Sequence, residues 1–281
     1  MIKGWKEEIL STPEDVFNKL ITLRIRKNFW VFRGSNTVYN NLFSSIDREF
    51  RDKQLSRNNK ISLESQSLEA FRINYKHLQV DDISPLLQVN IQTLMLMQHY
   101  GAKTRLLDWS TNPYIALYFA VCNVQKEDED GQVLGFEYKR YEFKGSQQWC
   151  HFPEMFDDQG EFKNYLEPAF EKIYKGNWLV CQFLYKYQFP RLLSQEGLFT
   201  FTSQFGVDHA TKIKDLLDNT DCHKVFIIKK QAKREIREIL RTKHQIYHGK
   251  LFPDPVGAAN ASNELLYDSI FDTLSKNTDI N

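Results

Sequence analysis

The spacing of apolar and polar positions near the start of the chain predicts a capped helix and then a short strand. Residues 12–15 combine threonine at the cap, proline at the first helical position and an acidic side chain at the capping-box position. Apolar residues three and four apart extend this helix over about 12–26. The aromatic and β-branched run 29–32 then predicts a strand, which Gly34 ends so that Arg33 is delivered into a turn.

The middle of the chain predicts two amphipathic helices, then a strand that leads directly into an almost wholly apolar helix. Apolar positions at 62–78 and 85–100 follow the helical period. Residues 104–109 suit a buried strand. The segment 110–113 contains polar capping residues and a proline, which is typical of a helix start, and the apolar run 114–121 follows it.

The rest of the chain contains strands and helices in no regular alternation. We expect strands at 133–138, 178–189, 198–202 and 224–228, a helix near 211–217, and a C-terminal helix at about 258–275. This irregular order predicts an α+β fold, with packed helices on a mixed, largely antiparallel sheet. No internal repeat or linker marks a boundary, so we expect a single domain over 1–281.

Composition narrows the class of protein without identifying a function. Hydrophobic residues make up 42% of the chain, which is typical of a globular protein rather than a disordered one. The formal net charge of +1 gives no global field toward nucleic acid or an anionic membrane. No apolar run approaches the roughly 20 residues of a membrane span, and nothing resembles a secretory leader. We therefore expect a cytoplasmic protein without a membrane partner.

The four cysteines are widely spaced, and we expect them to be free thiols. Two Cys-His dipeptides, at 150–151 and 222–223, supply four groups that bind zinc in other proteins. They lack the short paired spacing of a zinc site, so we expect no metal.

Residues 98–109 place His, Lys, Arg and Asp in one short connection between apolar elements. Polar groups this dense beside a core need partners or a ligand. His99 is either a general acid or base or a hydrogen-bonded structural residue. Arg33, between an aromatic strand and a glycine, suits a phosphate or carboxylate, but a structural ion pair with Asp108 explains it equally well.

Two other classes of function remain open at this stage. Basic residues recur on the predicted helix 231–244 and could follow the phosphates of a nucleic acid, although glutamates interrupt them and a solvated helix face is the simpler interpretation. The candidates are Lys230, Arg234, Arg237 and Arg241. The abundance of aromatic residues also fits a non-catalytic interaction module. The sequence leaves the oligomeric state open.

Several motifs together resemble the FRG domain, a bacterial and phage-associated family named after a Phe-Arg-Gly motif. Residues 32–34 are Phe-Arg-Gly, and the long central motif lies at 97–110. The apolar segment 116–120 and the block 191–200 also resemble the family. The resemblance extends over about 30–266, with Lys103 standing where the family commonly has proline.

The order of the motifs also resembles the layout of ADP-ribosyltransferases: an arginine at the end of an early strand, a later strand that leads through Ser110 and Thr111 into a helix, and a third strand block with Gln195 and Glu196. It implies that NAD is a co-substrate, that the enzyme is a transferase or NAD-glycohydrolase whose acceptor is a protein or a nucleic acid, and that its biology is that of a toxin or phage-defence effector. The implied catalytic residues are Arg33, His99, Gln195 and Glu196. The implied nucleotide-binding residues are Arg33, Gly34, Thr104, Arg105, Asp108, Ser110 and Thr111.

Two of these assignments have structural alternatives. Ser110 and Thr111 could simply cap the following helix. Gln195 and Glu196 could form a turn between strands, and strand register decides which of the two faces the pocket.

Overall fold

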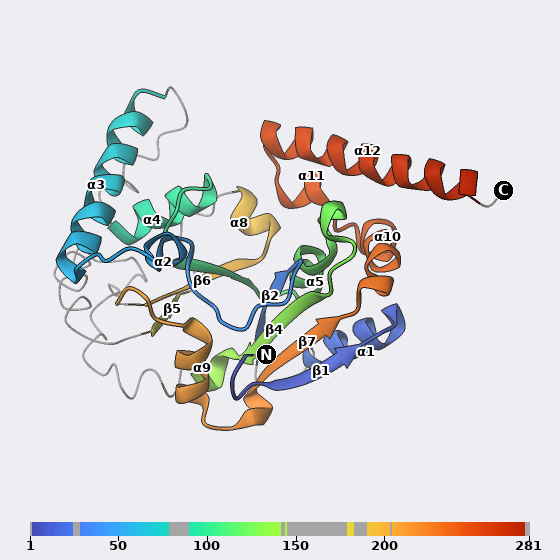
Figure 1. The fold of residues 1–281 in the computed structure, drawn as a ribbon, viewed down its shortest axis with the longest axis horizontal. Helices are drawn as coiled ribbons and strands as arrows, with labels where there is room; N and C mark the ends of the chain where they lie inside the picture. The colour runs from blue at the N-terminus through green and yellow to red at the C-terminus, as the bar shows by residue number, and fades with distance from the viewer. Residues whose placement is uncertain are drawn as a thin grey trace, which may run out of the picture.

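The computed structural model describes residues 2–24, 29–78, 90–141, 144, 179–182, 190–202 and 204–278. Within them, seven strands form one sheet with the order β1-β7-β4-β2-β3-β6-β5 (Figure 1). The strands are β1 (Lys6–Leu10), β2 (Trp30–Ser35), β3 (Leu106–Ser110), β4 (Gly131–Glu137), β5 (Leu179–Gln182), β6 (Gly197–Thr202) and β7 (His223–Ile228). Only β1 and β7 pair in parallel, and every other pair is antiparallel. The predicted α+β fold with a largely antiparallel sheet is confirmed.

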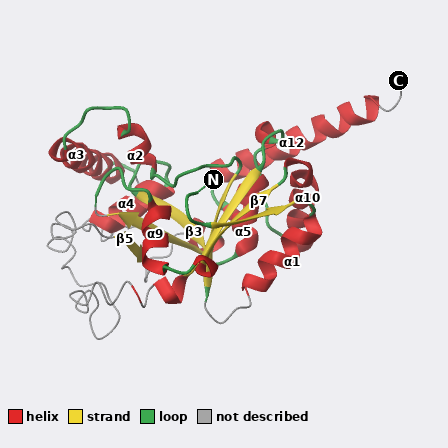
Figure 2. Ribbon diagram, turned by 60° about the horizontal axis from the view of Figure 1, so that its bottom comes forward, coloured by secondary structure: helices red, strands yellow, loops and turns green. Residues whose placement is uncertain are grey.

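Helices cover both faces of this sheet and extend from its ends (Figure 2). They are α1 (Pro13–Arg24), α2 (Ser45–Phe50), α3 (Arg57–Lys76), α4 (Asn90–His99), α5 (Pro113–Val121), α8 (Pro190–Ser194), α9 (His209–Leu217), α10 (Lys233–His244), α11 (His248–Leu251) and α12 (Pro255–Thr278). None of the helices in the described ranges is both long and apolar enough to cross a membrane.

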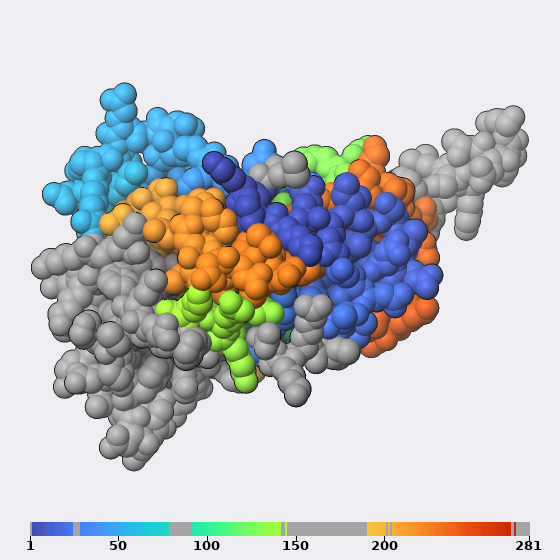
Figure 3. Space-filling view, turned by 90° about the horizontal axis from the view of Figure 1, so that it is seen from below, coloured from blue at the N-terminus to red at the C-terminus, as the bar shows by residue number. Residues whose placement is uncertain are grey.

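Successive strand residues contribute to two separate cores, as the two-residue period of a strand requires. On β2, Phe32 packs with α1, α5 and α10, whereas Val31 packs with α9 on the other face. The N-terminal segment lies beside the region around β7 on the surface of the molecule (Figure 3), where β1 and β7 pair. The start of the described chain therefore pairs with a strand more than 200 residues later.

Helix α5 lies almost in backbone contact with the sheet. A Cβ atom added at Gly34 would lie 1.7 Å from the carbonyl oxygen of Ala116, and one at Gly131 would lie 2.3 Å from that of Ala120. Glycine is thus required at both positions because only a bare backbone allows this approach. The strand β2 and the helix α5 are held at a fixed separation.

The structure corrects the predicted end of β2. The strand continues through Ser35, so Arg33 lies within it and is not delivered into a turn. Gly34 does not end the strand, because the glycine serves the close packing of α5.

Other element boundaries differ from the predictions in ways that local pattern does not reveal. The strand β1 was not predicted. The helix α3 begins at Arg57, behind the cap Ser56, rather than near residue 62. The predicted start of the next helix, at 85, and most of the predicted strand 178–189 lie outside the described residues.

Replacing Gly34 with alanine should destabilise the protein by roughly 2–3 kcal/mol, since the new methyl group collides with a backbone carbonyl that cannot turn away. Urea unfolding followed by circular dichroism measures this free energy. Gly249→Ala is the matched control, because its nearest contact, at 3.4 Å to the Cβ of Ala261, is of ordinary length. Equal stabilities of the two variants would show that α5 can move away from β2.

Candidate functional site

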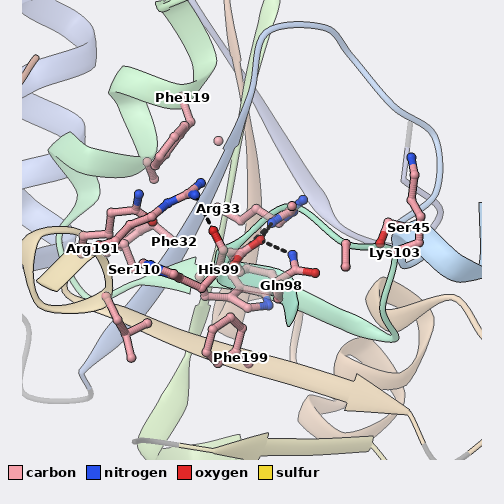
Figure 4. Close-up of a pocket in the computed structure, with 18 residues that line it drawn as sticks. Phe32, Arg33, Ser45, Gln98, His99, Lys103, Ser110, Phe119, Arg191 and Phe199 are labelled. Carbon is pink, nitrogen blue, oxygen red and sulfur yellow. Dashed lines mark hydrogen bonds and ion pairs between the residues drawn. The ribbon is translucent and has the colours of Figure 1, made fainter. Parts of the chain in front are cut away.

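The candidate site is a cavity of about 340 Å³ that opens where β2 and β3 separate. These neighbouring strands share one ladder pair, Phe32 with Ser110. Beyond that pair, β2 and β3 no longer pair with each other, and Arg33, Gly34 and Asp108 line the cavity between them. Each of these residues still pairs with the strand on its other side. Helices α4, α5 and α8 supply much of the remaining wall, together with Ser45, the loop residues 101–103 and Phe199 (Figure 4).

Arg33 extends across this gap between the strands. Its Nη1 donates to the backbone carbonyl of Asp108 at 2.6 Å and lies 3.9 Å from the Oδ2 of the same residue. Burial lowers the pKa of Arg33, and the charge of Asp108 opposes that shift. The guanidinium stays charged near neutral pH, because its ordinary value is so high. Nε and Nη2 have no hydrogen-bond partner among the described residues, so they can bind a ligand.

A chain of hydrogen bonds holds the Asp108 carboxylate in place. Gln98 Nε2 donates to Asp108 Oδ2 at 2.7 Å, and Gln98 Oε1 accepts from Thr104 Oγ1 at 2.7 Å. The amide of Thr104 in turn donates to Ser45 Oγ at 2.9 Å. Thr104 is fully buried, and its hydroxyl is used within this chain. The structure therefore gives Thr104 a positioning role behind the cavity wall, not ligand contact.

Arg191, on α8, is a second guanidinium in the same cavity. Its Nη1 donates to the carbonyl of His99 at 2.6 Å, and its guanidinium carbon lies 4.2 Å from the ring centroid of Phe252. Burial lowers the pKa of Arg191 as well, opposed by Asp108 and Asp254. Sequence reasoning did not select this residue as a ligand contact, although the family-like block 191–200 contained it.

His99 lines the cavity beside Arg191 (Figure 4). Burial lowers its pKa, and repulsion from Arg191 lowers it further, whereas Asp254 opposes the change. The imidazole is therefore neutral near pH 7, which is the form that can accept a proton.

Gln195 and Glu196 lie next to each other in the turn between α8 and β6, but their side chains have different surroundings. Gln195 lines the cavity; its Nε2 donates to the carbonyl of Leu251 at 3.1 Å, and its own carbonyl accepts from Ser110 Oγ at 2.7 Å. Glu196 adopts a φ of 43°, and its side chain is absent from the cavity lining.

Glu196 instead binds the start of α5. Its carboxylate accepts from Thr111 Oγ1 at 3.1 Å and from Nδ2 of Asn112, the N-cap residue, at 2.8 Å. A carboxylate at this place also interacts favourably with the helix dipole. The cap of α5 is therefore Asn112 rather than Ser110 or Thr111, and the turn that holds Glu196 joins a helix to a strand, not two strands. Ser110 both lines the cavity and ties β3 to that turn.

Arg105 does not reach the cavity, contrary to its predicted role in nucleotide binding. The side chain is fully buried, with Nε 2.7 Å from Glu64 Oε1 and Nη2 2.6 Å from Glu64 Oε2. It also stacks on Phe205, with 4.5 Å from the guanidinium carbon to the ring centroid. The paired charges join α3 to the start of β3, and this structural use explains the correction.

The basic residues around α10 do not form the continuous cationic face predicted for nucleic acid. Arg237 Nη1 lies 2.6 Å from Glu127, and Arg237 Nη2 lies 3.3 Å from Asp268. Arg241 pairs with Glu238 on the same helix. Lys230 and Arg234 are exposed, but the acidic partners neutralise the middle of this surface.

No group of three or more metal-binding side chains occurs within the described ranges. The dipeptide at 150–151, one half of the weighed four-ligand site, lies outside those ranges.

Replacing Glu64 with alanine should destabilise the fold by about 3–5 kcal/mol, because the Arg105 charge would stay buried without its partner. The matched control on the same helix is Glu69→Ala, whose side chain is 61% exposed and lies 3.8 Å from Arg72. That change should cost less than about 1 kcal/mol. Chemical unfolding of both variants tests the assignment, which similar losses would contradict.

Comparisons with known proteins agree with the motifs in the first part of the site. No curated protein and no solved structure matches the chain. The family model described as FRG domain matches residues 28–129, which include Arg33, His99 and Asp108 but not Arg191. Residues 28–129 of this chain are an FRG domain.

Proposed function

We propose that the cavity between β2 and β3 binds a phosphorylated nucleotide, with NAD as the first candidate. The observation that carries this proposal is the presence of two guanidiniums, Arg33 and Arg191, in one cavity with N–H donors still available. Guanidinium groups bind phosphate oxygens through two parallel hydrogen bonds, and a diphosphate offers several such oxygens.

The charges around the cavity favour an anionic ligand. Arg33, Lys103 and Arg191 line it, against Asp108 as the acidic member of the lining. Lys103 is 3.3 Å from Glu49 and 60% exposed, so water weakens that ion pair. The neutral His99 adds no charge.

Size and aromatic lining are suited to a nucleotide. The volume of about 340 Å³ lies at the lower end of the usual range for ligand sites. Phe119, from α5, lines the cavity and is only partly buried, which makes its ring available for stacking on a base or on nicotinamide. Helix α5 thus contributes an aromatic ring to the cavity that the two arginines line.

In a reaction that cleaves NAD in this cavity, the carboxylate that stabilises the positive charge on the ribose would be Asp108 rather than Glu196. Cleavage of the bond between ribose and nicotinamide sends the bonding electron pair to nicotinamide and leaves an oxocarbenium ion, which a nearby carboxylate stabilises. Asp108 lines the cavity, and its Oδ1 is not used by a described residue. Water, or the acceptor of the ADP-ribosyl group, would then attack the ribose, and His99, which lines the same cavity, would take up the proton.

The arginines can be tested by isothermal titration of NAD, ADP-ribose and nicotinamide against wild type, Arg33→Lys and Arg191→Lys. We expect each lysine variant to bind NAD and ADP-ribose roughly 10- to 100-fold more weakly, since a charge-assisted hydrogen bond contributes about 1.5–3 kcal/mol. Affinity for uncharged nicotinamide should change little. Arg57→Ala, an exposed arginine at the start of α3, is the control.

Absence of saturable NAD and ADP-ribose binding by the wild type, in protein with an unchanged circular dichroism spectrum, would overturn the nucleotide proposal. Weakening of all three ligands alike would instead indicate that the lysine variants distort the cavity.

Turnover has a separate test. Wild-type protein incubated with NAD should release nicotinamide, detectable by chromatography, and Asp108→Asn should lower that rate roughly 100-fold or more. Glu196→Gln should keep most of it, because Glu196 lies at the helix start. In a toxin or phage-defence role, expression would deplete cellular NAD and slow growth in an Asp108-dependent way. The opposite ranking of the two variants would return the catalytic role to Glu196.

A further inference from the structure

The long helix α12 turns its polar side toward the rest of the protein. Tyr118 donates from its hydroxyl to Glu264 at 2.5 Å, and Arg237 donates to Asp268 at 3.3 Å. A Cβ atom at Gly257 would lie 1.9 Å from the Phe252 carbonyl oxygen, so the helix start is packed backbone to backbone. The body-facing positions are spaced three and four apart: Gly257, Ala261, Glu264 and Asp268.

The opposite side of the same helix is apolar and exposed. Val256 is 70% exposed, Leu266 is 56% exposed and Ile270 is 47% exposed. With Ala259 and Asn263, also exposed, these residues continue the spacing of three and four and therefore share one face, which we call the outer stripe.

This arrangement reverses the usual pattern of a surface helix, which turns its apolar stripe to the core. Contact with the body uses hydrogen bonds and small residues, and the large apolar residues of the outer stripe stay about half or more exposed within the described chain. The C-terminal part of α12 also projects beyond the other elements in both ribbon views (Figures 1 and 2). The outer stripe itself, on the side of α12 away from the body, is exposed to a second helix.

Three features of the outer stripe match pairing with an identical helix. Its alternating spacing of three and four is that of the a and d positions of a two-stranded coiled coil. Asn263 occupies a central a position, where an asparagine amide can donate to and accept from its own copy and so fixes the register. The flanking residues with described side chains are uncharged, so two copies meet without like-charge repulsion: Asn260, Ser262, Tyr267 and Ser269.

We propose that the outer stripe of α12 is a self-association surface, through which two copies of this chain form a parallel helix pair. In such a dimer the apolar residues of each stripe pack between those of the other, and Asn263 pairs with Asn263 of the second copy. The two cavities between β2 and β3 remain open, because α12 contacts the body through the other face.

Sedimentation equilibrium of the full chain over a wide range of concentrations tests the proposal. The mass should rise from 33.3 kDa toward twice that value as the concentration increases. Leu266→Glu combined with Ile270→Glu should raise the dissociation constant at least about tenfold, because the charges would be buried in the pair. Asn263→Val should tighten association and admit species larger than a dimer.

Ile73→Glu is the matched control, since Ile73 is 50% exposed on another helix, α3, outside the outer stripe. This variant should dimerise like the wild type, and all variants should keep the same melting temperature when monomeric. A wild type that stays monomeric throughout, or a dimer that survives the double glutamate substitution, would overturn self-association. The first result would leave a helix from a different protein as the occupant of the stripe.

Discussion

The hydrogen bond from Arg33 to the backbone carbonyl of Asp108 is the interaction on which the candidate site depends. Neighbouring strands normally satisfy such a carbonyl through the ladder, but β2 and β3 share one pair and then separate. The guanidinium takes the place of the missing strand amide and spans the gap. Because one N–H satisfies the carbonyl, the cavity stays open while the rest of the guanidinium faces it.

Helix α5 forms one wall of that cavity. Its backbone approaches β2 at Gly34, its start is fixed by Asn112 and Glu196, and its outer side places Phe119 in the lining. The glycine of the Phe-Arg-Gly motif is therefore required for helix packing, which is a different role from that of the arginine beside it. The arginine serves the cavity, whereas the glycine holds a helix against the strand.

Local pattern predicted those features that are determined within a few residues. The capped start of α1 is confirmed, with the Asp15 amide donating to Thr12 Oγ1, and the start of α5 at a proline behind a polar cap is confirmed as well. The dense polar connection 98–109 contains residues that bond to one another and residues that line the cavity, as expected of polar groups that must find partners beside a core.

Features that depend on residues far apart in the chain were not predicted from the sequence. Whether Arg105 faces a ligand or the core is decided by Glu64, which lies on a helix far earlier in the chain. Arg191 enters the site only because α8 precedes the strand that pairs with β3. The segment that forms β1 has no clear alternation, and its strand exists because β7, near the other end of the chain, offers a parallel edge.

The single pair between β2 and β3 also divides the sheet mechanically. On one side lie β1, β7, β4 and β2; on the other lie β3, β6 and β5, and little backbone bonding joins these two sub-sheets. Arg33 belongs to the first sub-sheet, whereas Arg191 enters through the segment that leads into the second. An anion held by both guanidiniums would thus act as a cross-brace over the weakest seam of the sheet. A ligand bound in the cavity would therefore restrain the movement of the two sub-sheets relative to each other. Any motion that separates the two sub-sheets would in turn weaken the binding of that ligand.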